Sequence, residues 1–115
     1  MMKINFKSEN SSTHLTPCLI VPCIESTKPT NCAKELDDKF KGAISAAYKE
    51  KRFEGKANQT LLLNSLGLVK AQNILLIGIG KVEEITGEKL RLAAGTAIKT
   101  AEKNGFKKVS LVSSN

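Results

Sequence analysis

The chain has 115 residues and a mass of 12.4 kDa, a size that fits one domain. Hydrophobic residues make up 41% and charged residues 25%, close to the averages of globular proteins, which argues against disorder. No apolar run approaches the ~20 residues that span a bilayer, and the N-terminus lacks the apolar core of a signal peptide. We therefore expect an ordered cytoplasmic domain without membrane contact.

Five stretches of the sequence predict strands. Residues 2–7 alternate between apolar and polar, as in a strand with one buried face. Residues 18–21 (CLIV) form a continuous apolar run between Pro17 and Pro22, typical of a strand buried on both faces. Three further strands are predicted over residues 60–63, 73–77 and 107–112, the last with Val109, Leu111 and Phe106 facing inward.

Two helices are predicted from apolar residues at helical spacing. The first covers residues 32–49 after Asn31 as N-cap, with a buried stripe of Leu36, Phe40, Ala43, Ile44 and Ala47. The second covers residues 87–104, between Thr86 as N-cap and Gly105 as terminator. Its buried side is expected to hold Leu90, Ala94, Ala97, Ile98 and Ala101, and its solvent side Arg91, Lys99, Glu102 and Lys103. The resulting β-β-α-β-β-α-β order predicts an α/β domain, a mixed sheet flanked by helices.

A glycine-containing turn, residues 78–81 (GIGK), follows a predicted strand, where phosphate-binding loops occur. A dinucleotide-binding fingerprint would need a glycine at position 83, which is Glu83, and a P-loop would need Ser or Thr at position 82, which is Val82. Glu83 and Glu84 would also repel a phosphate. The favoured interpretation is that Gly78 and Gly80 let the chain turn sharply off a buried strand.

Metal-ligating residue types occur without a metal-binding pattern. The candidates are one histidine and three cysteines, reduced by default in a chain without a secretory signal: His14, Cys18, Cys23 and Cys32. Cys18 and Cys23 lie on one extended segment, five residues apart, so their side chains should point to opposite faces of a sheet. No CxxC pair is present. We expect Cys18 to fill core space.

Catalytic patterns are also missing from the sequence. It contains one histidine and no Gly-x-Ser-x-Gly motif. The acidic pairs Asp37-Asp38 and Glu83-Glu84 are adjacent in sequence, so their side chains diverge, and we interpret them as solvated surface charge. The sequence therefore predicts no catalytic, cofactor-binding or metal-binding residue in this chain.

The net charge of +7 suits an anionic partner without requiring one. Basic residues cluster twice, at Lys49, Lys51, Arg52 and Lys56, and at Lys99, Lys103, Lys107 and Lys108. Nucleic-acid modules add aromatic residues or a recognition helix, but the single tyrosine is Tyr48 and no helix-turn-helix pattern occurs. Solvated lysine is therefore favoured over a dedicated nucleic-acid site.

From Phe53 to Val112 the chain resembles the N-terminal domain of leucyl aminopeptidases, also called cytosol aminopeptidases or, in bacteria, aminopeptidase A. The resemblance rests on residues 53–56 (FEGK), 59–63 (QTLLL), 73–81 (NILLIGIGK) and 90–97 (LRLAAGTA), in this order and spacing. It implies that residues 1–115 form a macro-domain-like, three-layer N-terminal domain, incomplete at its end. Gly95 lies inside the second predicted helix, where glycine costs about 1 kcal/mol relative to alanine, so we expect close approach of this helix to the sheet.

The resemblance also implies a separate catalytic domain, absent from this chain. That domain holds two divalent metals, typically zinc, manganese or magnesium, and a metal-bound hydroxide attacks the peptide bond beside a free N-terminus. The ligand signature of the family, NTDAEGRL, does not occur here. No catalytic or metal residue is therefore carried over to this chain.

The resemblance implies a non-catalytic domain of a cytoplasmic, hexameric enzyme that removes N-terminal residues, leucine preferentially. Its partners would be its own catalytic domain and the other subunits, and its role assembly or access to the active site. DNA binding, as in some bacterial relatives, and ADP-ribose binding, from the macro-like fold, are the alternatives. An incomplete sheet would also leave an edge strand able to pair with a second copy.

Overall fold

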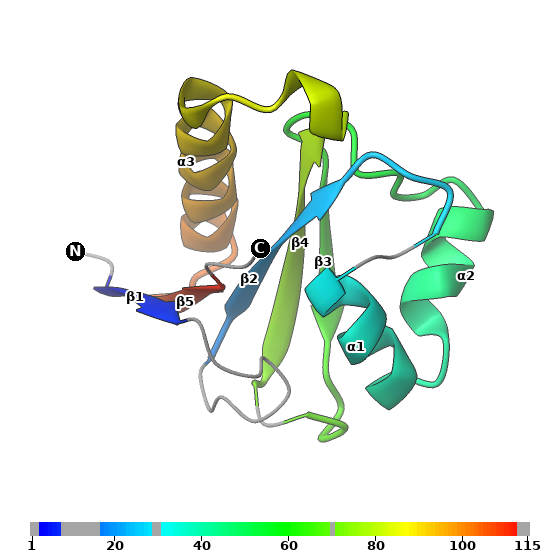
Figure 1. Ribbon diagram of the computed structural model, residues 1–115. Helices are drawn as coiled ribbons and strands as arrows, with labels where there is room; N and C mark the ends of the chain where they lie inside the picture. The colour runs from blue at the N-terminus through cyan, green and yellow to red at the C-terminus, as the bar shows by residue number, and fades with distance from the viewer. Residues whose placement is uncertain (1–2, 8–16, 29–30, 70, 113–115) are drawn as a thin grey trace.

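A computed structural model describes residues 3–7, 17–28, 31–69 and 71–112 (Figure 1). Its strands are β1 (Lys3–Lys7), β2 (Leu19–Ile24), β3 (Thr60–Asn64), β4 (Asn73–Gly80) and β5 (Lys108–Val112). Its helices are α1 (Asn31–Lys39), α2 (Ala43–Lys49) and α3 (Gly87–Lys103), with a short 3-10 turn, η2 (Val82–Glu84). Among these described helices, none is long and apolar enough to cross a membrane.

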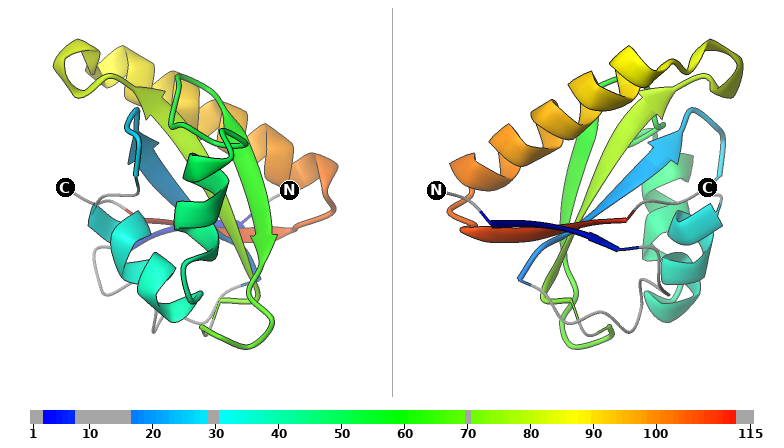
Figure 2. Two further views of the ribbon diagram at one scale, coloured as in Figure 1. Left: turned by 90° about the vertical axis from the view of Figure 1, so that its right-hand side faces the viewer. Right: turned by 60° about the vertical axis from the view of Figure 1, so that its left-hand side comes forward.

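The strands form one mixed sheet in the order β1-β5-β2-β4-β3. The neighbours β1 and β5, β5 and β2, and β2 and β4 are parallel, whereas β3 runs antiparallel to β4. Helices α1 and α2 lie on one face of the sheet and α3 lies on the other (Figures 1 and 2). The predicted α/β class, the mixed sheet and the three layers are confirmed.

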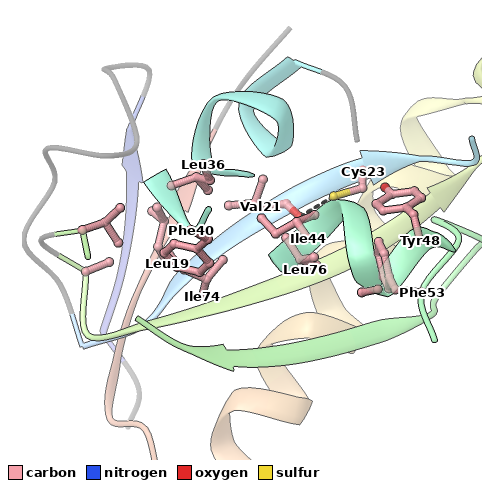
Figure 3. Packing of buried hydrophobic residues seen from close by; sticks show 13 residues of the cluster. Leu19, Val21, Cys23, Leu36, Phe40, Ile44, Tyr48, Phe53, Ile74 and Leu76 are labelled. Carbon is pink, nitrogen blue, oxygen red and sulfur yellow. Dashed lines mark hydrogen bonds between the residues drawn. The ribbon is translucent and has the colours of Figure 1, made fainter. Parts of the chain in front are cut away.

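The core is divided into two clusters by the sheet, and β2 contributes to both. Leu19, Val21 and Cys23 pack toward α1 and α2 (Figure 3), whereas Cys18 and Ile20 belong to the cluster under α3. Cys18 and Cys23 therefore face opposite sides of the sheet, as their spacing predicted. All of these side chains are almost fully buried.

The strand β2 is longer than the sequence predicted, because Pro22 lies inside it. Pro22 pairs with Ile77 of β4. On the other side of β2, the pairing with β5 that involves described residues is limited to Leu19 and Ile20. Beyond Ile20 the side of β2 toward β5 needs no ladder donor, so a residue without an N–H fits there.

The helix predicted over residues 32–49 is in fact two helices. Lys41 and Gly42 have positive φ angles of 56° and 85°, a left-handed conformation that an α-helix cannot contain. The resulting turn separates α1 from α2 and leaves Ala43 exposed. The other members of the predicted stripe remain buried: Leu36, Phe40, Ile44 and Ala47.

The ends of α3 agree with the sequence prediction. Thr86 Oγ1 accepts a hydrogen bond from the Lys89 N–H at 3.1 Å, as an N-cap does. At the C-terminal end Gly105 has a φ of 86°, and the Phe106 N–H donates to the carbonyl of Ala101 at 3.1 Å. This is the hydrogen bond of a Schellman ending.

The buried side of α3 differs from the prediction. Its fully buried residues are Ala93, Ala97 and Ala101, whereas Leu90 is 43% exposed. Leu90 shares the face of these alanines but lies in the first turn of the helix, where burial has not yet begun. The small alanines make contact with the sheet beneath.

Two glycines, Gly55 and Gly78, lie where one backbone segment passes close to another. The prediction that Gly95 allows such a close approach, between α3 and the sheet, is wrong. A Cβ atom at Gly78 would overlap the carbonyl oxygen of Lys56, and one at Gly55 would overlap the carbonyl oxygen of Ile24. A Cβ atom at Gly95 would meet nothing within 4 Å. Gly78 and Gly80 are also part of β4, so the strand does not end at residue 77 as predicted.

This difference predicts opposite effects for two glycine-to-alanine changes. Gly78→Ala should lower the free energy of unfolding by about 2 kcal/mol or more, because the backbone of the 55–56 segment must move. Gly95→Ala should raise it by up to about 1 kcal/mol, since alanine favours a helix interior. Urea denaturation of both variants and the wild type measures this. Equal destabilisation by the two changes would contradict the assignment.

Candidate functional site

The first candidate site is a hollow at the carboxyl ends of the parallel strands β2 and β4. In open α/β sheets ligands bind at this edge. The hollow has a volume of about 310 Å³ and is lined by Glu25, Ser26, Thr27, Glu54, Lys81, Val82 and Glu83. It therefore includes Lys81, the last residue of the Gly-Ile-Gly-Lys segment.

The backbone N–H groups beside this hollow are already engaged within the protein. The Gly78 N–H donates to the carbonyl of Gln59 at 2.7 Å, and the Gly80 N–H donates to the carbonyl of Gly55 at 2.9 Å. The Glu25 N–H in turn donates to the carbonyl of Gly80 at 2.9 Å. A phosphate cradle needs such N–H groups directed at the ligand, and these are directed at carbonyl oxygens.

The charges around the hollow also disfavour a phosphate. Three carboxylates line it against a single lysine, Lys81. Glu54 forms an ion pair with Lys56 at 3.3 Å, and Glu83 and Glu84 are exposed. The geometry and the charge therefore do not form a phosphate cradle. The interpretation that both glycines turn the chain off the strand is wrong for Gly78, which lies inside β4 and allows the close approach of Lys56, whereas Gly80, the last residue of β4, has a positive φ of 88°.

The cysteine and histidine candidates are not brought together among the described residues. Cys18 and Cys23 lie on opposite faces of the sheet and cannot share one metal ion. His14 and the side chain of Cys32 lie outside the part of the chain that the structure describes. Within that part, no group of three His, Cys, Asp or Glu residues is placed to hold a metal ion.

Of the acidic pair Asp37-Asp38, only Asp38 lies on the surface. The interpretation of both residues as solvated surface charge is therefore wrong for Asp37. Asp38 is exposed, whereas Asp37 is 9% exposed. Oδ1 of Asp37 accepts a hydrogen bond from the Ser45 N–H at 2.9 Å, and its Oδ2 accepts one from the Ser45 hydroxyl. Asp37 thus satisfies a donor in the first turn of α2 from the preceding helix.

Sequence reasoning missed this role because it predicted one continuous helix, in which no second N-terminus needs a partner. Gly42 in the middle of the predicted helix was the available signal, since glycine is common where helices end.

Burial raises the pKa of the Cys18 thiol from 9.0 to about 11. The pKa of Tyr48 is also raised, by burial first and then by Cys23. Tyr48 packs edge-on against Phe53, with ring centroids 5.6 Å apart. A thiol with a raised pKa is a poor nucleophile at neutral pH, so Cys18 has the properties of a core residue, as predicted.

The basic clusters lie on the surface. In the first, Arg52 forms an ion pair with Glu50 at 2.9 Å. In the second, Lys99 and Lys103 border a shallow depression of about 570 Å³ together with Glu102, so a carboxylate lies within this basic surface. Lys107 and Lys108 are exposed as well.

The fold defines the class of protein first: an α/β domain of the macrodomain type. The solved macrodomain of Mycobacterium tuberculosis DarG matches 96% of this chain and 76% of its own, with a TM-score of 0.69 and 13% identity. A solved leucine aminopeptidase mutant from tomato matches the whole chain with a TM-score of 0.76 and 19% identity. The match covers 24% of the tomato chain.

The sequence comparison then identifies the family. The family model described as "Cytosol aminopeptidase family, N-terminal domain" matches residues 20–115, and this chain belongs to that family. A probable cytosol aminopeptidase of Geobacter sp. (strain M21) is 38% identical over 97 residues, covering 84% of this chain and 20% of the relative.

Two further relatives agree. A probable cytosol aminopeptidase of Nitrosomonas europaea is 35% identical over 96% of this chain and 22% of the relative, and the cytosol aminopeptidase of Pseudomonas aeruginosa PAO1 is 38% identical over 86% and 20%. The chain thus spans about a fifth of the length of these relatives, and it corresponds to their N-terminal domain.

The two hydrogen bonds to Asp37 predict a cost for its removal. Asp37→Ala should lower the free energy of unfolding by about 1–2 kcal/mol, because a helix cap and a buried hydrogen bond are lost. The exposed neighbour provides the matched control, and Asp38→Ala should change stability by less than about 0.5 kcal/mol. Thermal unfolding of both variants measures the difference, and the account of Asp37 fails if the two changes have the same effect.

The raised pKa of Cys18 predicts a loss of stability in alkali. The folded protein holds this thiol protonated up to about pH 11, whereas the unfolded chain releases the proton near pH 9. The stabilisation is therefore complete below pH 9 and falls as the pH rises toward 11, by up to about 1.4 kcal/mol per pH unit. Urea denaturation at pH 8, 9 and 10 measures the slope, which should become shallower in Cys18→Ala. A wild-type slope of zero between pH 9 and 10 would be inconsistent with this pKa.

Proposed function

We propose that residues 1–115 are the non-catalytic N-terminal domain of an aminopeptidase that removes N-terminal residues, leucine preferentially, from peptides in the cytoplasm. The observation that carries the proposal is the match of residues 20–115 to the N-terminal domain of the cytosol aminopeptidase family. The relatives are about five times as long as the matched segment, so four-fifths of their length is available for a separate catalytic domain.

The chemistry of the proposed enzyme belongs outside this chain. The parent enzyme would bind two divalent metals, zinc, manganese or magnesium, which supply a bound hydroxide that attacks the peptide bond. The described residues do not fit such a metal pair, because no three potential ligands converge. We therefore assign no step of the reaction to a residue of this chain.

The proposed role of the domain is assembly with its own catalytic domain and with the other subunits of a hexamer, or control of access to the active site. Several large apolar side chains support a role in contacts: Leu66 is 81% exposed, Val82 60% and Leu92 59%. Side chains of this kind become buried when a larger chain or a subunit covers them.

DNA binding has weaker support. Its basis is the net charge of +7 and the exposure of Lys99 and Lys103, one helical turn apart on α3. Ordinary solvated lysines on a basic protein have the same properties, and Glu102 lies between these two.

A domain exchange tests the proposal. The chain alone should not hydrolyse leucine p-nitroanilide with zinc, manganese or magnesium. A chimera in which it replaces the matching segment of the Geobacter relative should hydrolyse the substrate within about tenfold of that relative, a difference of ~1.4 kcal/mol or less in barrier height. The same chimera with Gly78→Leu, which disrupts the domain, should lose its native assembly.

Two results would contradict the proposal. One is metal-dependent turnover by the purified 115-residue chain. The other is a chimera that contains a folded N-terminal domain, as judged by protease resistance, and yet neither assembles nor hydrolyses the substrate.

A further inference from the structure

The two edges of the sheet differ in charge. The edge strand β1 begins and ends with a lysine, Lys3 and Lys7, and lysines on an edge strand prevent pairing with another sheet. At the opposite edge lies β3 (Figure 2), and residues 57–69 around it contain no charged side chain. In a chain in which a quarter of the residues are charged, β3 is therefore an edge without this protection.

The hydrogen bonds of β3 show which backbone groups point away from the sheet. At one end the Gly78 N–H donates to the carbonyl of Gln59, and at the other the Ser65 N–H donates to the carbonyl of Gln72. Because bonded and non-bonded positions alternate along an antiparallel strand, Gln59, Leu61, Leu63 and Ser65 are directed toward β4. The N–H and C=O groups of Thr60, Leu62 and Asn64 are then directed outward.

This outward set is complementary to itself. When a second copy is placed antiparallel on a two-fold axis through Leu62, Leu62 lies opposite its own equivalent and Thr60 lies opposite Asn64. All three outward positions then meet outward positions of the other copy, so each N–H faces a C=O across the axis. An isologous interface needs this self-complementarity.

The side chains along β3 fit the same arrangement. Leu62 is half-buried and packs against the cluster under α3, while Leu61 and Leu63 pack against the cluster under α1 and α2. Each leucine thus has an exposed part that a facing strand could cover. Leu66 and Leu68, in the turn that follows β3, are 81% and 43% exposed and extend the apolar surface beyond the strand.

The distribution of charged residues also favours β3 as the edge at which two copies meet. Two copies with a net charge of +7 each repel one another, and the repulsion is smallest where their uncharged segments face. We propose that β3 pairs with β3 of a second copy of this chain, so that the two five-stranded sheets join into one continuous sheet. The proposal rests on the geometry of β3 and not on the aminopeptidase function.

The size of the contact sets the expected affinity. Stable dimers bury about 1,200–2,000 Å² in total, and a pair of five-residue strands with a few flanking leucines is at the low end or below it. The pairing is therefore expected to be weak, with a dissociation constant of about 10 µM to 1 mM.

Single cysteines on β3 test the register. In a Cys32→Ser background, Leu62→Cys places two thiols opposite each other with Cα atoms about 5.5 Å apart, within disulfide range. Asn64→Cys, at a more exposed position on the same edge, places the two equivalent thiols about 13 Å apart along the strands. With oxidised glutathione, Leu62→Cys should form covalent dimers at least about tenfold faster than Asn64→Cys. Equal rates would overturn the proposal.

Analytical ultracentrifugation tests the pairing without cysteines. The wild-type chain should show a concentration-dependent monomer–dimer equilibrium between about 10 µM and 1 mM. Thr60→Lys, which introduces a lysine on the edge, should raise the dissociation constant by at least about tenfold. Asn104→Lys adds the same charge at the end of α3 and should have a much smaller effect. A wild type that is monomeric throughout, or a dimer that Thr60→Lys leaves unchanged, would overturn the proposal.

Discussion

The parallel pairing of β2 with β4 is the interaction on which the rest of the structure depends. The two strands pair from Leu19 opposite Ile74 to Ile24 opposite Gly80, and both are buried on both faces. Strands of this kind are stable only when helices cover each side. One cluster of the core lies between this pair and α1–α2, and the other lies between it and α3.

The same strand pair determines what its carboxyl end can do. There the segment around Gly55 and Lys56 crosses so closely that position 78 has no space for a Cβ atom. The crossing uses the N–H groups of Gly78 and Gly80 in backbone hydrogen bonds. At an edge of the sheet where many α/β proteins bind ligands, the N–H groups of Gly78 and Gly80 are thus directed at carbonyl oxygens of the chain itself rather than at the hollow beside them.

Much of this fold could be predicted because its signals are local. The continuous apolar runs of β2 and β4, the cap at Thr86 and the glycine at position 105 each lie within a few residues of the structure they specify. The spacing of Cys18 and Cys23 was enough to place them on opposite faces. For the candidate sites, mismatches with known motifs argued against a phosphate site at residues 78–81, and the N–H groups of Gly78 and Gly80 donate to carbonyl oxygens of the chain itself.

The predictions were wrong where the local structure depends on contacts with residues elsewhere in the sequence. The break between α1 and α2 depends on a left-handed turn and on Asp37, whose partner Ser45 lies in the next helix. Gly78 and Gly95 are both glycines within regular elements, and only the crossing segment distinguishes them. Leu90 lies on the same face of α3 as the buried alanines and yet is 43% exposed, a difference that the periodicity of a single helix cannot predict.

The central claim is that this chain is one domain of a larger aminopeptidase. The most direct measurement is an immunoblot of a lysate of the source organism with an antibody raised against this domain. The account predicts a band about five times larger than 12.4 kDa, because the matched segment makes up a fifth of each relative. A single band at 12.4 kDa would contradict it.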